Sequence, residues 1–377
     1  MSDRVDINAD MLIWAIDRAG IELYAFIDKF PKVQKWLMGE KKPTVKQLED
    51  FSKKVYLPFG YLLLTEPPQE TLPIPYFRSN GNNTGKVSIN VYDTILLIQQ
   101  RQDWLRNYLI DNNYGALSFV AKFHNQNNVK DIVADIRQTL NLHENWAADF
   151  TTWQEAQDHL ITHIEDKGII TVFNGVVENN GYRKILVDEC RGFVLVDDMA
   201  PFMFINNGDW KSAQMFTIAH ELAHIWTGHS AGFDFRKLRP ADDPIEKLCD
   251  KIAAEFLVPE VAFTKVWETN STFQYAARYF KVSEIVIARR ALDTNKISRE
   301  EFFQYYDVYS QKEFQKKTNR SAGGDFYALT RKRLSITFAS HVNNAVKSGK
   351  LLYRDAYKLT GLKGDTFQNF FSKQITK

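Results

Sequence analysis

Cysteine is scarce in this sequence, and long hydrophobic runs are missing. Among 377 residues only Cys190 and Cys249 are cysteines, too few for the disulfide framework of a secreted protein or, by themselves, for a thiolate zinc site. No run approaches the roughly 20 apolar residues of a membrane helix. The polar start, Met1 to Ile7, has no signal-peptide pattern. We therefore expect a cytoplasmic protein with no membrane segment.

A large net charge is also absent, but the charges are distributed unevenly. The net charge is +2 at pH 7, yet residues 311–377 contain 14 Lys and Arg against 4 Asp and Glu. Such a basic segment can contact nucleic acid or an acidic partner, or it can fold back on the acidic remainder of the chain. The sequence leaves these alternatives open.

Proline is concentrated at one point, where it marks a predicted domain boundary. Apolar residues recur at helical spacing over residues 9–64, which predicts a small helical bundle. Residues 66–79, EPPQETLPIPYFRS, contain four prolines and cannot form a helix. Helical patterns return over residues 88–142 and 154–166. The length of the chain also favours two or three domains over one.

Short β-rich runs appear in the middle of the chain. They begin at Gly168, Gly192 and Pro201, and a predicted helix over residues 210–227 follows them. Another helix, IEKLCDKIAAEFLV, ends at Pro259, and helical patterns continue to the basic tail. The predicted fold is therefore mainly α with a small β-sheet, an α+β fold.

The run QMFTIAHELAHIWTGHSAGF, which starts at Gln214, predicts a metal site. His220 and His224 are four residues apart, so on a helix both can turn a ring nitrogen toward one ion. Glu221 lies about 100° around the helix and can accept a proton from a water molecule on the metal without being a ligand. The alternative is a buried helix whose two histidines are satisfied by hydrogen bonds.

A catalytic zinc site needs a third protein ligand and an open position. A His-x-x-Gly-x-x-His continuation is absent, since Thr227 and Ser230 stand where it requires Gly and His. We predict Glu246 as the third ligand, with Asp250 one turn later hydrogen-bonded to a ligand imidazole. Glu246 could instead be a solvated charge on an amphipathic helix. The weaker candidate ligands are His229, Asp242, Asp243 and Glu255.

At these residues the sequence resembles the ImmA/IrrE family of zinc metallopeptidases, in its long form with an N-terminal Xre-like helix-turn-helix. The matching segments are FTIAHELAHIWTGH, IEKLCDKIAAEFLVP and RGFVLVDDMAPFMFINNGDWKSAQMFT, together with KKPTVKQLEDFSKKVYLPFGYLLLTEPP, LPIPYFRS, YFKVSEIVIARRAL and GGDFYALTRKRL. The sequence departs from the family pattern at Cys249, at Ile252 and at Tyr76, where the family usually has Ala, Phe and Asp.

The resemblance implies a zincin-like peptidase domain flanked by helical domains. It implies Zn²⁺ on His220, His224 and Glu246, with Glu221 as the general base. It also implies a protein substrate, a repressor or antitoxin-like regulator, in phage, mobile-element or stress control. The expected segments are a helix-turn-helix domain (1–68), a linker with a helical segment (69–144), the metallopeptidase domain (145–268) and a C-terminal helical region with the basic tail (269–377).

A second interpretation is a DNA-binding regulator or antitoxin-like partner that uses the zincin fold as a scaffold. Residues 1–65 contain 10 Lys and Arg against 9 Asp and Glu, and the third predicted helix, KVQKWLMG, is short. DNA binding by this domain therefore competes with a structural or dimerising role, and homodimerisation stays open. Such a regulator would be indifferent to loss of Glu221. Candidate donors for the oxyanion of a peptidase are Arg236, Arg239 and Asn206.

Overall fold

The computed structural model describes residues 4–70, 76–77, 87–233, 243–316 and 325–374. The chain divides into two compact units, residues 1–73 with 83–95, and residues 74–82 with 96–377. Helix α5 (Ile89–Asp111) begins in the first unit and continues in the second. The predicted fold class is confirmed, because helices dominate and the larger of the two sheets has only five strands.

The first unit is a small helical core. Phe51 packs edge-on against Phe26 and Trp36 in its interior. Thr44 and Gln47 form a capping box that starts the fourth helix. The helices are α1 (Ala9–Arg18), α2 (Leu23–Lys29), α3 (Lys32–Leu37), α4 (Val45–Lys54) and the 3-10 helix η1 (Phe59–Leu63). Helix α3 is short, as the sequence indicated, and DNA binding by this unit stays a prediction.

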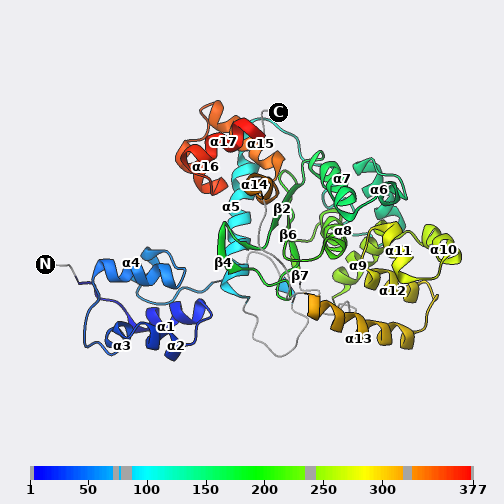
Figure 1. The fold of residues 1–377 in the computed structure, drawn as a ribbon. Helices are drawn as coiled ribbons and strands as arrows, with labels where there is room; N and C mark the ends of the chain where they lie inside the picture. The colour runs from blue at the N-terminus through cyan, green and yellow to red at the C-terminus, as the bar shows by residue number, and fades with distance from the viewer. Residues whose placement is uncertain (1–3, 71–75, 78–86, 234–242, 317–324, 375–377) are drawn as a thin grey trace. The chain divides into compact units, whose positions relative to one another are not determined.

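A mixed sheet forms the centre of the second unit (Figure 1). Its strand order is β1-β7-β5-β6-β2, with β5 antiparallel to both of its neighbours and β2 parallel to β6. Strands β2, β5 and β6 are buried throughout, in agreement with their mostly apolar sequences. The strands are β1 (Tyr76–Phe77), β2 (Ile170–Asn174), β5 (Gly192–Leu195), β6 (Phe202–Asn206) and β7 (Ala231–Phe233), with a separate hairpin of β3 (Val176–Val177) and β4 (Asn180–Lys184).

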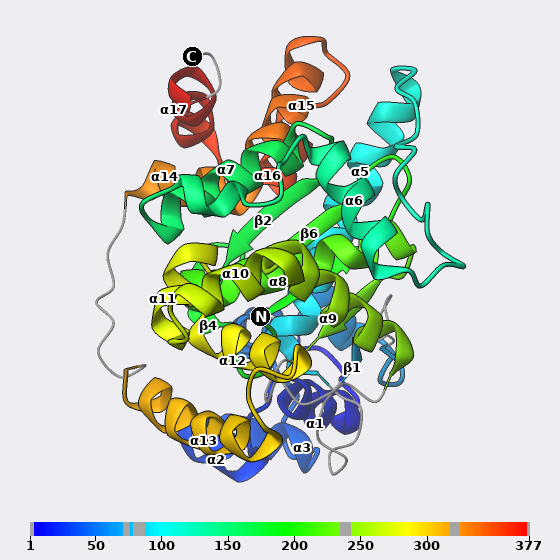
Figure 2. The ribbon, with the colours of Figure 1, turned by 90° about the vertical axis from the view of Figure 1, so that its right-hand side faces the viewer.

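One face of this sheet is covered by a large helical layer (Figure 2). Helix α8 packs directly on β5 and β6, and α9 packs on α8. Their side chains share one hydrophobic core. The helices of this part are α6 (Val129–Leu140), η2 (Trp146–Asp149), α7 (Trp153–Glu165), α8 (Lys211–Thr227), α9 (Pro244–Leu257), α10 (Glu260–Thr269), α11 (Phe273–Phe280), α12 (Glu284–Asp293) and α13 (Arg299–Lys316).

The opposite face packs against α5 and C-terminal helices. Phe338 contacts both Trp104 of α5 and Phe202 of β6 through edge-on ring packing. Buried Arg101 donates hydrogen bonds to the carbonyl groups of Leu359 and Arg333, near the ends of two of these helices. The C-terminal helices are α14 (Phe326–Leu334), α15 (Ile336–Lys347), α16 (Tyr353–Thr360) and α17 (Gly364–Gln374).

The basic C-terminal segment is therefore largely folded onto the sheet. Helix α14 contacts β2, and α15 and α17 contact α14. This is one of the alternatives that the charge distribution left open, while nucleic-acid or protein contacts of the segment stay predictions. Among the described residues, no helix is both long and apolar enough to cross a membrane.

Candidate metal centre

Helix α8 places the two histidines in the interior of the second unit. It runs from Lys211 to Thr227, close to the predicted 210–227, and every residue from Gln214 onward is buried. The helix ends at Gly228, whose φ of +78° favours glycine. A Cβ atom there would also lie 2.7 Å from Cβ of Ala121. Tight packing on all sides thus fixes the rotation of α8 and the direction of its side chains.

Helix α9 brings the predicted third ligand to α8. Asp243 caps its N-terminus by accepting hydrogen bonds from the backbone NH groups of Ile245 and Glu246. Pro244 occupies the first turn, where its missing NH costs nothing. Glu246 follows in the same turn and is only 1% exposed. Asp243 is therefore a capping residue rather than a ligand.

His220, His224 and Glu246 form a buried cluster whose donor atoms all lie within 4.8 Å of one another. Nε2 of His220 is 3.0 Å from Nε2 of His224 and 3.1 Å from Oε2 of Glu246. Nε2 of His224 is 3.3 Å from Oε1 of Glu246. Ligands about 2.1 Å from a tetrahedral zinc ion are separated by roughly 3.4 Å, close to these distances, so this donor set fits zinc.

The charges of the cluster also favour a cation. Burial disfavours an imidazolium at His220, but hydrogen bonds to Asp250 and Glu246 outweigh it and raise the pKa of His220 to about 10. Burial likewise disfavours a carboxylate at Glu246, but hydrogen bonds from His220 and His224 lower its pKa to about 2. The surrounding carboxylates thus stabilise a positive charge at His220, next to the position where a bound metal ion would supply one.

Glu221 lies beside the cluster and has no hydrogen-bond partner for either carboxylate oxygen among the described residues. It is 1% exposed, and this burial raises the pKa of Glu221 to about 8. An unpartnered buried carboxylate is costly to stability, so it indicates a functional role or a ligand. The neighbouring strand leaves room for it, because a Cβ atom on Gly192 would lie 3.1 Å from Oε1 of Glu221.

Asp250 of α9 contacts His220 at Nδ1, the ring nitrogen that does not face Glu246. Its Oδ1 lies 3.0 Å from Nδ1 of His220, which donates this hydrogen bond. The contact leaves Nε2 of His220 pointing toward Glu246 and fixes the ring orientation. The sequence predicted this arrangement from the spacing of Asp250 and Glu246.

Several weaker candidates lie outside the cluster. His229 stacks on His124, with ring centroids 4.8 Å apart, and Glu255 pairs with Arg290. Asn206 was a candidate oxyanion donor, but both hydrogens of its side-chain amide are used, by the carbonyl groups of Ile185 and Cys190. It holds a loop instead, and that candidate is wrong. Asp242, Arg236 and Arg239 lie outside the described residues.

The sequence patterns did not indicate two residues that lie near the cluster. Gly192 begins β5 and allows it to approach Glu221, and the only sequence signal was a glycine directly before an apolar run. Phe216 precedes His220 by one helical turn, and their ring centroids are 6.5 Å apart. An apolar residue at this spacing resembles any core position, so nothing in the sequence marked it.

Two family models match parts of the chain. Residues 164–292, which hold α8 and α9, match the IrrE N-terminal-like domain of peptidase family M78. Residues 334–373 match a domain of unknown function (DUF8813). No curated protein and no solved structure matched the chain. The first match supports the ImmA/IrrE resemblance for this part of the chain, and together with the buried cluster it supports a metallopeptidase-like domain there.

Proposed function

We propose that the protein is a zinc-dependent endopeptidase that cleaves a regulatory protein of the repressor or antitoxin type. The observation that supports this most is the buried His220, His224 and Glu246 cluster with the unpartnered carboxylate of Glu221 beside it. A scaffold role alone would not require Glu221 to be buried without a partner, since that arrangement costs stability. The match to a peptidase family supports the same class of reaction.

In the proposed reaction, His220, His224 and Glu246 would hold Zn²⁺, and Asp250 orients His220. A bound zinc ion would supply Lewis acidity to the scissile carbonyl group and to the attacking water. Glu221 takes a proton from that water as its oxygen bonds to the carbonyl carbon. Glu221 then gives the proton to the leaving nitrogen as the C–N bond breaks.

The proposed setting is prophage, mobile-element or stress control in the cytoplasm. It rests on the resemblance of the sequence to the ImmA/IrrE family, of which the family match supports the part over residues 164–292. In this setting the first unit would recognise DNA or a protein partner, and the second would cut the regulator.

Glu221→Gln provides the test, because it removes the base and keeps the shape of the side chain. Zinc-loaded wild-type protein and the variant are each incubated with a proteome from the source cell, and new N-termini are identified by mass spectrometry. We expect new termini from one or a few regulators only with the wild-type protein, and a loss of about 10²-fold or more in the variant. The same termini formed equally by both proteins, or none formed by either, would contradict the proposal.

A further inference from the structure

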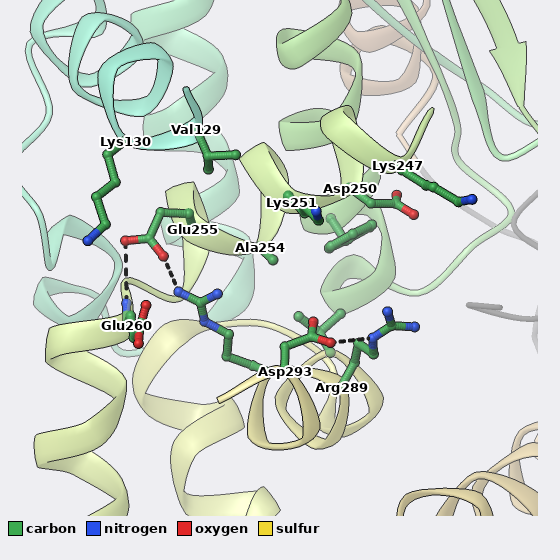
Figure 3. A pocket seen from close by; sticks show the side chains of 13 residues that line it. Val129, Lys130, Lys247, Asp250, Lys251, Ala254, Glu255, Glu260, Arg289 and Asp293 are labelled. Atoms are coloured by element: carbon green, nitrogen blue, oxygen red, sulfur yellow. Dashed lines mark hydrogen bonds and ion pairs between the residues drawn. The ribbon is translucent and has the colours of Figure 1, made fainter. Parts of the chain in front are cut away.

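A cavity of about 480 Å³ lies directly behind the metal centre, between α9 and α12. Figure 3 shows α9 side chains, including Lys247, Asp250 and Lys251, along one wall and Arg289 and Asp293 of α12 opposite them. This volume is typical of a pocket for a small ligand or a large side chain. Nothing in the proposed reaction so far uses it.

The cavity adjoins the metal centre through two side chains. Asp250 lines the cavity and also accepts the hydrogen bond from His220. Phe216 lines it too, with its ring next to that of His220. A ligand in the cavity would therefore lie next to the two side chains that contact His220.

The acidic groups of the cavity are mostly engaged within the protein. Glu255 accepts hydrogen bonds from Arg290 and from the backbone NH of Glu260. Asp293 pairs with Arg289 at 3.0 Å. Asp250 accepts the hydrogen bond from His220. Among the acidic lining residues that the structure describes, this leaves the exposed carboxylate of Glu260 without a partner.

The lysines of the cavity are not engaged in this way. The ammonium groups of Lys130, Lys247 and Lys251 have no hydrogen-bond or ion-pair partner within the described part of the chain. Lys247 and Lys251 lie one turn apart on α9, on either side of Asp250 in sequence. The charge available to a ligand is therefore positive, and the lining also includes the apolar side chains of Phe216 and Val286.

We propose that this cavity receives an acidic side chain of the protein substrate close to the scissile bond. The inference rests on the proposed peptidase function and adds a substrate class to it. Lys247 and Lys251 would bind the carboxylate, while Phe216 and Val286 would contact its methylene groups. Aspartate or glutamate at this position would then be preferred over the corresponding amides and over lysine.

Binding of anchored peptides to zinc-loaded, full-length Glu221→Gln protein tests the proposal without requiring cleavage. The probes are fluorescein-labelled peptides with a hydroxamate zinc-binding group, in two sets that extend to either side of it. The residue next to the hydroxamate is Glu, Gln or Lys, and affinity is measured by fluorescence anisotropy. In one of the two sets we expect the Glu peptide to bind about tenfold more tightly than the Gln peptide, since hydrogen bonds between charged groups are the strong ones.

Charge reversal identifies the cavity as the source of the preference. Lys247→Glu with Lys251→Glu is expected to abolish the tenfold preference for Glu and to favour Lys. The matched control is Lys265→Glu with Lys296→Glu, two exposed lysines outside the cavity, which should keep the preference. Equal affinities for Glu and Gln peptides, or a preference that survives in the cavity variant, would overturn the proposal.

The two proposals can fail separately. Tight hydroxamate binding without any charge preference overturns the cavity proposal alone. If no hydroxamate peptide binds, the proposed zinc site is contradicted, and the affinities of the same peptides without the hydroxamate test the cavity. A preference for the Glu peptide that is lost only in the cavity variant then supports a site for acidic ligands. Equal affinities for the Glu and Gln peptides overturn it.

Discussion

At Gly192 the backbone of β5 passes so close to α8 that a side chain does not fit. A Cβ atom there would lie 2.5 Å from Cγ2 of Thr217, 3.0 Å from the carbonyl oxygen of Phe204 and 3.1 Å from Oε1 of Glu221. The backbone of Gly192 is not in a left-handed conformation, so the constraint is one of space alone. The position of Glu221 therefore depends on a residue from another element.

We expect Gly192→Ala to lower the free energy of unfolding by about 1–3 kcal/mol, the usual effect of overpacking. It should also lower peptidase activity by displacing Glu221. The matched control is Gly181→Ala in β4, where nothing lies within 4 Å of the added Cβ; that change should be neutral or slightly stabilising. Urea unfolding of both variants measures the difference. A Gly192 variant as stable as the Gly181 variant would contradict the packing argument.

At the scale of elements, α8 and α9 are joined at the metal centre by the hydrogen bond between Asp250 and His220. Asp250→Asn keeps an acceptor for Nδ1 of His220 but removes the negative charge that makes the imidazole a better ligand. We expect zinc affinity to fall about 10–100-fold with little change in fold. Competition with a chromogenic chelator measures it. Unchanged affinity, equal to that of the exposed control Asp158→Asn, would mean that Asp250 only supports packing.

The end of α7 meets strand β2 and helix α15 at Glu165. Its carboxylate accepts hydrogen bonds from the hydroxyl groups of Thr171 and Thr337. Burial raises the pKa of Glu165 above its ordinary value of 4.5, although these hydrogen bonds oppose the shift. The folded state therefore favours the protonated acid, and the ionised form at neutral pH costs stability.

We expect Glu165→Gln to be more stable than the wild-type protein at pH 7.5, because the variant has no buried carboxylate to ionise. This difference should shrink as the pH falls toward 4.5, because the wild-type carboxylate becomes protonated in the folded state and its cost disappears. Urea unfolding at several pH values, with chelator present in all samples, measures the difference. A stability difference between the two proteins that is constant, or that grows toward acid pH, would show that the folded state does not disfavour the ionised carboxylate of Glu165.

At the scale of the whole molecule, the sequence predicted local features better than long-range ones. The fold class, the extent of α8 and the approach of Glu246 to His220 and His224 followed from helical spacing and from the order of the two helices. Strand order did not follow, because β1 and β7 come from segments more than 150 residues apart in sequence and nothing local specifies their pairing. The interpretation of Asn206 was wrong, since its hydrogen-bond partners lie on a separate loop.

The cavity behind α9 could not be predicted for a similar reason. Lys247 and Lys251 are ordinary residues on an amphipathic helix, and only the folded chain shows that their acidic neighbours are engaged by Arg290, by Arg289 and by His220. Charge counted along the sequence therefore misses the charge available at a site.

The central claim is that His220, His224 and Glu246 bind zinc and that Glu221 does not. Elemental analysis of the purified protein tests it most directly, on the wild type, His220→Ala, Glu246→Ala and Glu221→Gln after equilibration with zinc. We predict about one zinc ion per chain in the wild type and in Glu221→Gln, and little in the two ligand variants. A wild-type protein that neither contains zinc nor binds added zinc, or ligand variants that keep it fully, would contradict the account.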